Sequence, residues 1–290
     1  MVFAPELPAY FARIGYAGSR EPTLANLNEI ILAHVQSIPF ENLDVLLGRP
    51  IDLAPAAIEH KLVHLRRGGY CFEQNALLLH VLGALGYAVK PLSARVRFSR
   101  PREFTPPRTH LLLRVELEGL SWLVDVGVGG LSPTCALRLV ADVVQETPHE
   151  PRRLVREGAW QGFELRAPDA RLFHQAYVAG EWRDVCELTL EEMPPIDREL
   201  ANWYTSAHPG SHFRDRLVVA RATREGRVSL LNRELTLRRS DGCAIESRML
   251  MTPDELHAAL TGELGLVLPE RLEIACAGIT WPSRADVTVG

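Results

Sequence analysis

The chain has 290 residues, 47% hydrophobic and 23% charged, which is the composition of a globular protein with enough apolar material for a full core. Its formal net charge of −4 disfavours nucleic acid as a partner and favours a small molecule or a protein. The five cysteines are scattered and lack any Cys-x-x-Cys pair, so neither a disulfide framework nor a structural metal site is expected.

The first residues of the chain do not have the pattern of a signal peptide. Residues 1–10 contain two prolines and a glutamate instead of a basic stretch followed by an apolar core. No apolar run in the sequence approaches the roughly 20 residues needed to cross a bilayer. We therefore expect a cytoplasmic protein with no membrane partner.

The first part of the chain has the hydrophobic spacing of helices. A short helix is predicted over residues 8–14, and a longer amphipathic helix over residues 23–37, which Thr23 would cap. A third helix is predicted over residues 72–85. Residues 1–86 are therefore expected to form a helical bundle.

Beyond the third helix the pattern changes to short strands separated by turns. The strands are predicted at residues 88–98, 110–117, 122–126, 163–166 and 171–177. The stretch 144–153, with two prolines and mixed charges, is expected to be a connecting loop. Residues 87–193 therefore predict an antiparallel sheet or barrel.

The last part of the chain, residues 194–290, has mixed character. A helix is predicted over residues 197–206, a strand pair over residues 227–238, and a second helix over residues 252–262. The second helix begins with a threonine cap, a proline at its first position and two acids in its first turn. A smaller α/β unit is expected here, which makes the whole chain an α+β protein.

Cys71 stands at the predicted N-terminus of the 72–85 helix. A thiol attacks an acyl carbon well only as a thiolate, and the unpaired amides of a helix N-terminus stabilise negative charge on the sulfur. Gly68 and Gly69 allow the backbone to turn sharply just before the cysteine. We therefore interpret Cys71 as a nucleophile rather than as a packed structural cysteine.

A thiol nucleophile needs a base within reach of the sulfur and a third group that orients the base. His110 is the candidate base because it opens a predicted strand of alternating register. Three other histidines, His34, His64 and His80, lie within helical patterns and are interpreted as packed or surface residues.

The orienting acid is predicted from a hairpin. If Glu118 and Gly119 form a two-residue turn, residue 112 pairs with residue 125 across the hairpin. His110 and Asp125 then lie on one face as diagonal neighbours, a separation that long side chains can bridge. A shift of one residue would place them on opposite faces. The hypothesis that Asp125 orients His110 therefore depends on this turn.

Three glycines, Gly127, Gly129 and Gly130, follow the candidate acid. A glycine-dense segment lets the backbone approach a ligand closely and exposes amides to phosphate. The pattern alone is weak, because no helix clearly follows and no lysine is present, so it is not a nucleoside-triphosphate loop. Its position directly after Asp125 is what indicates a ligand-binding role.

Six segments of the chain carry a resemblance to a known family. They are Tyr10–Tyr16, Ile38–Leu43, Arg66–Asn75, Thr109–Leu111, Val124–Gly127 and Asn202–Tyr204. Together they resemble the arylamine N-acetyltransferases over nearly the whole chain, and the run Arg-Gly-Gly-Tyr-Cys-Phe-Glu-Gln-Asn is the most specific of them.

The resemblance implies a fold and a reaction. The fold is a papain-like core built from a helical bundle, a β-barrel and an α/β lid. The reaction is ping-pong acetyl transfer from acetyl-CoA, through a cysteine thioester, to an arylamine, arylhydrazine or arylhydroxylamine, with no metal. The triad it implies is Cys71, His110 and Asp125, the three residues that the physical argument also selects.

The resemblance also implies the surroundings of the triad. Thr109 and the loop containing Gly127, Gly129 and Gly130 are expected near coenzyme A. Phe40, Val96 and Val128 are expected to line the acceptor pocket. Glu73 and Arg67 are expected to make structural polar contacts, and Asn75 to orient the loop.

One position departs from the family pattern. Val128 stands where the family usually has an aromatic residue between two glycines. Loss of a ring should widen the acceptor pocket and remove an aromatic contact worth roughly 0.5–1.5 kcal/mol. This leaves open an amide synthase that uses the same triad with a carrier-protein-bound or longer acyl donor.

A hydrolase and a non-catalytic interaction module are further alternative functions. The oligomeric state, monomer or homodimer, also stays open.

Overall fold

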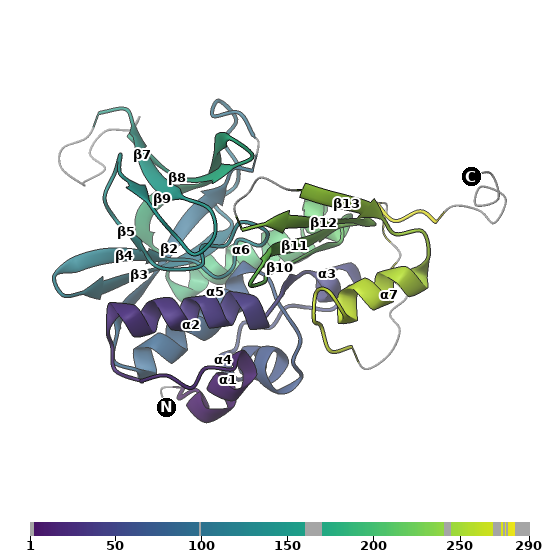
Figure 1. The fold of residues 1–290 in the computed structure, drawn as a ribbon, viewed down its shortest axis with the longest axis horizontal. Coiled ribbons are helices and arrows are strands. Elements are labelled where there is room, and N and C mark those ends of the chain that lie inside the picture. Colours follow the sequence, from purple (N-terminus) through teal and green to yellow (C-terminus); the bar gives the residue numbers. More distant parts are fainter. Residues whose placement is uncertain are drawn as a thin grey trace.

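The computed structural model describes residues 3–98, 100–159, 170–240 and 245–268, together with residues 274, 276 and 278–281. Helices and two antiparallel sheets combine in an α+β fold (Figure 1), which confirms the predicted fold class. The predicted strand at residues 163–166 lies outside the described residues.

The described helices include those that the hydrophobic spacing predicts. They are α1 (Leu7–Ile14), α2 (Leu24–Ser37), α3 (Leu43–Leu46), α4 (Pro55–Glu59), the π-helical turn η1 (His60–His64), α5 (Cys71–Ala84), α6 (Pro195–Ala207), the 3-10 turn η2 (His212–Arg214) and α7 (Pro253–Thr261). Thr23 caps α2 as expected, because its hydroxyl accepts a hydrogen bond from the Asn26 amide at 3.3 Å.

Eight strands form the larger sheet, in the order β5-β4-β3-β2-β9-β8-β7-β6. They are β2 (Ala88–Val96), β3 (His110–Leu117), β4 (Leu120–Val124), β5 (Leu137–Arg138), β6 (Val144–Gln145), β7 (Arg152–Glu157), β8 (Arg171–Val178) and β9 (Glu181–Glu192). The Gln145 side chain on edge strand β6 accepts from the Arg138 amide on edge strand β5 at 2.7 Å and donates to the Arg138 carbonyl at 3.0 Å. This amide link joins the two edges, so the sheet is a nearly closed barrel.

Two features of the barrel differ from the sequence predictions. The predicted loop at residues 144–153 is wrong at both ends, because β6 and the start of β7 pair with each other there. Strand β9 was not predicted, since charged side chains alternate along its first part, yet it pairs with both β2 and β8.

The β3–β4 hairpin has the predicted register. Leu113 pairs with Val124 and Leu117 pairs with Leu120, which leaves Glu118 and Gly119 as the two-residue turn. Both turn residues have a positive φ, 54° and 75°, as a tight hairpin turn of this kind requires. The hairpin therefore carries the start of β3 and the end of β4 to the same end of the barrel.

A second sheet has the strand order β1-β10-β11-β12-β13. Its strands are β1 (Phe40–Glu41), β10 (Val218–Ala222), β11 (Gly226–Leu231), β12 (Glu234–Arg239) and β13 (Ile245–Met249). Strands β11 and β12 confirm the predicted strand pair, and α7 packs its apolar face on this sheet (Figure 1). Because β1 comes from the N-terminal part of the chain, it ties the helices to the C-terminal sheet.

The apolar core joins the helices to both sheets. One buried cluster combines residues of α1, α2 and α5 with Leu111, Leu113 and Val124 of the hairpin and with Ala220 of β10. A second cluster fills the barrel, and a third lies between α7 and its sheet.

The division of the chain into the structural units 1–86, 87–193 and 194–290 stays a prediction. Within the described part of the chain, no helix has the length and apolar character needed to cross a membrane.

The cap of α7 gives a test of this local structure. The Thr252 hydroxyl accepts a hydrogen bond from the Glu255 amide at 3.1 Å. We expect Thr252→Ala to lower the free energy of unfolding by about 1 kcal/mol, because one helix amide loses its acceptor. Urea unfolding measures the change. Thr252→Ser is the matched control, and an equal loss in both variants would contradict the capping role.

Candidate active site

Cys71 is the first residue of α5, as the sequence predicts. Tyr70 before it is extended, with φ −96° and ψ −170°, so the chain turns into the helix at the cysteine. The thiol is 5% exposed, and its Sγ lies 3.7 Å from the carbonyl oxygen of Thr109. The first amides of the helix therefore lie beside the sulfur, where they stabilise negative charge.

The two glycines before Cys71 are required by close packing. A Cβ on Gly68 would lie 2.2 Å from the Pro39 carbonyl oxygen, and one on Gly69 would lie 2.6 Å from Oε2 of Glu73. The Gly69 carbonyl in turn accepts from the Glu41 amide at 3.1 Å, which places β1 beside the start of the helix. Phe40 thereby lies beside Gly69, two residues before the cysteine.

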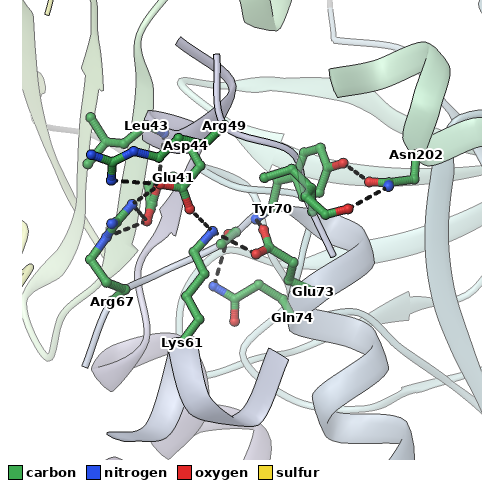
Figure 2. A network of polar contacts seen from close by, with 12 residues as sticks. Glu41, Leu43, Asp44, Arg49, Lys61, Arg67, Tyr70, Glu73, Gln74 and Asn202 are labelled. Atoms are coloured by element: carbon green, nitrogen blue, oxygen red, sulfur yellow. Dashed lines mark hydrogen bonds and ion pairs between the residues drawn. The ribbon is translucent and has the colours of Figure 1, made fainter. Parts of the chain in front are cut away.

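A buried polar network lies under the start of α5 (Figure 2). Glu73 accepts from the Tyr70 amide at 3.0 Å and from Lys61 Nζ at 2.7 Å. Arg67 donates twice to Oε1 of Glu41, at 2.7 and 3.0 Å. Asp44 bridges the two halves, because it lies 2.6 Å from Lys61 Nζ and 3.3 Å from Arg67 Nη2. These are contacts of the structural kind expected for Glu73 and Arg67.

Gln74, the next residue of α5, supports the same region (Figure 2). Its amide nitrogen donates to the Pro39 carbonyl at 2.8 Å, and its Oε1 lies 2.7 Å from Nε2 of His34. His34 is fully buried, and burial lowers its pKa to about 4, so the ring is neutral. Since Nε2 donates to Gln74, Nδ1 accepts from the Tyr10 hydroxyl at 2.8 Å. His34 is thus a packed residue, as the sequence predicts.

His110 and Asp125 meet where the hairpin strands end. His110 Nε2 lies 2.7 Å from Oδ2 of Asp125, and both side chains are 1% exposed. The other carboxylate oxygen accepts from the Asn75 side chain and from the Gly127 amide, each at 2.9 Å. Asn75 also accepts from the Val126 amide at 3.0 Å, so it holds the chain that leaves β4. The expected juxtaposition of imidazole and carboxylate is present.

Charges in this pair stabilise each other. Burial alone would lower the pKa of His110, but the charge and hydrogen bond of Asp125, together with the Cys71 side chain, raise it to about 10. Burial alone would raise the pKa of Asp125, but the facing imidazolium and the donors Asn75 and Gly127 hold it below its ordinary value. Because Nε2 faces the carboxylate, Nδ1 is the ring nitrogen left for the sulfur.

The glycine loop begins against the cysteine and runs outward. A Cβ on Gly127 would lie 2.7 Å from Cα of Cys71, so only glycine fits. Gly129 has φ 88° and faces the ring of Phe40. Gly130 is half-buried further along, and Thr109 is half-buried beside the sulfur. Thr109 and Gly127 therefore lie close to Cys71, and the loop reaches the ring of Phe40 at Gly129.

Aromatic side chains lie next to the loop and to the start of α5. The ring of Phe213 is 6.0 Å from that of Phe40 and 6.1 Å from that of Tyr70. Val128 is buried in the barrel core, and the half-buried Val96 packs against the same cluster. The structure therefore brings Val96 and Val128 together in the barrel, while Phe40 belongs to the helical core.

Two residues near the site were missed by the sequence reasoning. Phe213 lies in the turn η2, and nothing in its local pattern distinguishes it from other loop residues. Cys186 lies on the unpredicted strand β9, with its sulfur within 4.8 Å of ligand atoms of His110 and Asp125. Recognising the charged alternation of β9 as a barrel strand would have pointed to its inward-facing residues.

Metal ligation is geometrically conceivable at two places among the described residues: His110, Asp125 and Cys186, and Glu6, Glu59 and His64. In the first group the histidine and carboxylate already bind each other, and burial raises the pKa of the Cys186 thiol well above its usual range. A metal there would have to displace that hydrogen bond and ionise the thiol. The expectation of a metal-free enzyme stays a prediction.

A thiol at a helix N-terminus, a buried imidazole and an orienting carboxylate form the arrangement that a cysteine nucleophile requires. The N-acetyltransferase family model matches residues 23–273. The arylamine N-acetyltransferase of Mycolicibacterium smegmatis is 46% identical over 82% of this chain and 84% of its own. That of Escherichia coli strain K12 is 40% identical over 90% and 89%.

Solved structures agree with these relatives. The Mycobacterium marinum arylamine N-acetyltransferase, solved in complex with CoA, has a TM-score of 0.83 and 38% identity, covering 90% of this chain and 93% of that chain. The chain therefore belongs to the arylamine N-acetyltransferase family, and its class as an acetyltransferase follows. The family expected from the sequence is confirmed.

The packing of Gly127 gives a first test of the site. We expect Gly127→Ala to destabilise the fold by roughly 1–3 kcal/mol, because the new methyl group would push the loop away from Cys71 and Asn75. Thiol alkylation and urea unfolding measure the effect. Gly83→Ala in helix α5 is the control, since a Cβ there has no atom within 4 Å and alanine favours helix. Equal stability of the two variants would contradict the packing argument.

The charged state of the imidazole gives a second test. His110 has its pKa raised from 6.5 to about 10, so its stabilising effect is complete below pH 6.5 and is lost as the pH rises through about 10. Asp125 has a lowered pKa, so its stabilising effect is present at neutral pH and is lost in acid, as the pH falls below its ordinary value of 3.8.

We therefore expect the ring of His110 to stay protonated at pH 8. Nitrogen-15 NMR of the histidine side chains measures this, with the His110 signal assigned by its loss in His110→Gln. A ring that titrates near its ordinary pKa would show that the ion pair does not form.

Proposed function

We propose that this protein transfers an acetyl group from acetyl-CoA to an arylamine, arylhydrazine or arylhydroxylamine through a thioester on Cys71. The observation that carries the proposal is the buried hydrogen bond between His110 and Asp125, set beside a thiol at a helix N-terminus. Family membership and the CoA complex of the Mycobacterium marinum relative support the donor.

In the first half-reaction the Cys71 thiolate attacks the carbonyl carbon of acetyl-CoA. The free backbone amides at the start of α5 stabilise the oxyanion that forms. As the carbon–sulfur bond to coenzyme A breaks, the leaving thiolate takes the proton from Nδ1 of His110. The acetyl group is left on Cys71, and the imidazole is neutral.

In the second half-reaction the amine attacks the Cys71 thioester. Neutral His110 takes a proton from the amine nitrogen as the new bond forms, and the Cys71 thiolate leaves. The original ion pair is thereby restored. Asp125 stays ionised throughout, because its role is to orient the ring and stabilise the imidazolium.

The surroundings of the sulfur suggest where each substrate binds. Thr109, Gly127, Gly129 and Gly130 are the residues proposed to contact coenzyme A. Phe40 and Phe213, with Tyr70 close to the ring of Phe213, offer an aromatic surface suited to an aryl group. Val96 and Val128 would bound that pocket from the barrel, where Val128 occupies the position at which the family usually has a ring.

Intact-mass measurement after exposure to acetyl-CoA tests the proposal. We expect the mass of one acetyl group on the enzyme, its loss on addition of an arylamine, and the appearance of the N-acetylated amine. No acetyl-enzyme with acetyl-CoA, but acylation by a longer or carrier-bound donor, would favour an amide synthase. Rapid coenzyme A release that amines do not accelerate would favour a hydrolase.

Substitutions at the triad separate the roles of its members. Cys71→Ala should abolish the acetyl-enzyme, because it removes the thiol at the start of α5 that the proposal assigns as the nucleophile. Asp125→Asn should keep the fold but lower kcat/KM on the order of 10²- to 10⁴-fold, since the imidazole loses its charge partner. Arylamine acetylation is the measurement, with circular dichroism to check folding. Cys135→Ala removes a thiol elsewhere in the barrel and should retain activity; near-normal activity of Cys71→Ala would refute the nucleophile.

A further inference from the structure

A buried cluster of charges lies behind the glycine loop. It consists of Glu150 and three arginines, Arg152 on β7, Arg227 on β11 and Arg238 on β12. The side chains of Glu150, Arg152 and Arg227 are 3%, 0% and 3% exposed, and that of Arg238 is 17% exposed. Glu150 pairs with Arg152, and its Oε1 lies 3.0 Å from Arg227 Nη2 and 3.9 Å from Arg238 Nη2. This Glu150 cluster joins the barrel to the second sheet.

The cluster binds three consecutive carbonyls of the loop. Arg238 Nη2 donates to the Gly130 carbonyl at 3.0 Å, and Arg152 Nη1 donates to the Leu131 carbonyl at 2.8 Å. Arg152 Nη2 lies 3.5 Å from the Ser132 carbonyl. Guanidinium groups from two different sheets therefore hold the same short segment, and its carbonyl groups are turned toward the cluster.

The segment itself is a closed turn. The Ser132 amide donates to the Gly129 carbonyl at 2.9 Å, and the Gly129 amide donates to the Ser132 hydroxyl at 3.0 Å. The amides of Gly130 and Leu131 have no acceptor within the described residues, and both residues are half-buried. Consecutive unpaired amides of this kind bind anions.

Positive charge exceeds negative charge behind the turn. Three guanidinium groups face the single carboxylate of Glu150. The neighbouring His174 is neutral, because burial and Arg152 lower its pKa to about 3, and burial likewise lowers the pKa of His149. The Cys135 thiol is also neutral, since burial raises its pKa to about 11. Buried charge without a counter-charge is costly, so this excess favours an anion nearby.

We propose that the Glu150 cluster positions the Gly129–Ser132 turn so that the amides of Gly130 and Leu131, backed by the arginines, receive the diphosphate of the acyl-CoA donor. This inference rests on the proposed function, since it assigns a part of the donor to a part of the loop. Glu150, Arg152, Arg227 and Arg238 are positioning residues, because they act through the turn and do not contact the thioester.

Two donors with the same thioester separate this role from a general loss of structure. Acetyl-CoA carries the diphosphate, whereas S-acetyl-N-acetylcysteamine lacks it. We expect Arg238→Gln to lower the ratio of kcat/KM for acetyl-CoA to kcat/KM for the short donor roughly five- to tenfold, the size of one lost charge-assisted hydrogen bond. The loss should be in KM for acetyl-CoA, and Arg238→Lys should recover part of it.

Arg183→Gln is the matched control. Arg183 lies close enough to Arg238 to affect its pKa, but its side chain is 47% exposed and pairs with Glu181 at 3.9 Å. The substitution removes the same charge without affecting the turn, so the ratio of kcat/KM for acetyl-CoA to kcat/KM for the short donor should not change. An equal fall in the ratio for both variants, or an unchanged ratio for Arg238→Gln, would overturn the proposal.

Failure of the proposed function is recognised separately. A wild-type enzyme that is acetylated by the short donor and not by acetyl-CoA would overturn the assignment of acyl-CoA as donor, and with it this inference, before any variant is compared. A wild type that uses both donors, with a variant that loses both equally, would overturn only the positioning role.

Discussion

The buried pair of His110 and Asp125 is the interaction on which the rest of the site depends. Two charged groups at 1% exposure are tolerated only when each is paired and hydrogen-bonded. Asn75 and the Gly127 amide supply the remaining bonds to the carboxylate, so helix α5, the β3–β4 hairpin and the glycine loop must meet at one place. These hydrogen bonds fix the positions of the Cys71 sulfur and of the glycine loop relative to the pair.

Helix α5 is held on several sides by polar contacts rather than by apolar packing alone. Glu73 and Gln74 connect its first turn to Lys61 and to the His34–Tyr10 pair, and Tyr70 bonds Asn202 of α6 (Figure 2). Because a buried polar group is costly without its partner, such contacts select one position of the helix over nearby alternatives. A nucleophile at its first residue is thereby held at a defined distance from the barrel.

The same principle extends to the surroundings of the sulfur. Arginines from both sheets bind the carbonyls of the glycine turn, which leaves amides and positive charge for an anionic donor. Next to the turn, Phe40 and Phe213 offer aromatic surface. This combination suits a reaction in which a charged donor and an aromatic acceptor use one thiol in turn.

Local sequence determined the start of α5 at Cys71, the Glu118-Gly119 turn and hence the facing of His110 and Asp125, because these depend on helix capping, glycine and strand alternation. Tertiary structure alone decided the approach of Phe213, Cys186 and the Glu150 cluster, which come from distant segments with no local signal. Strand β9 was not predicted for the same reason: its charged residues are satisfied by partners from other segments, as Asp184 is by Arg102. A local sequence pattern predicts the secondary structure that a segment favours, whereas the burial and pairing of its side chains depend on the other segments that pack against it.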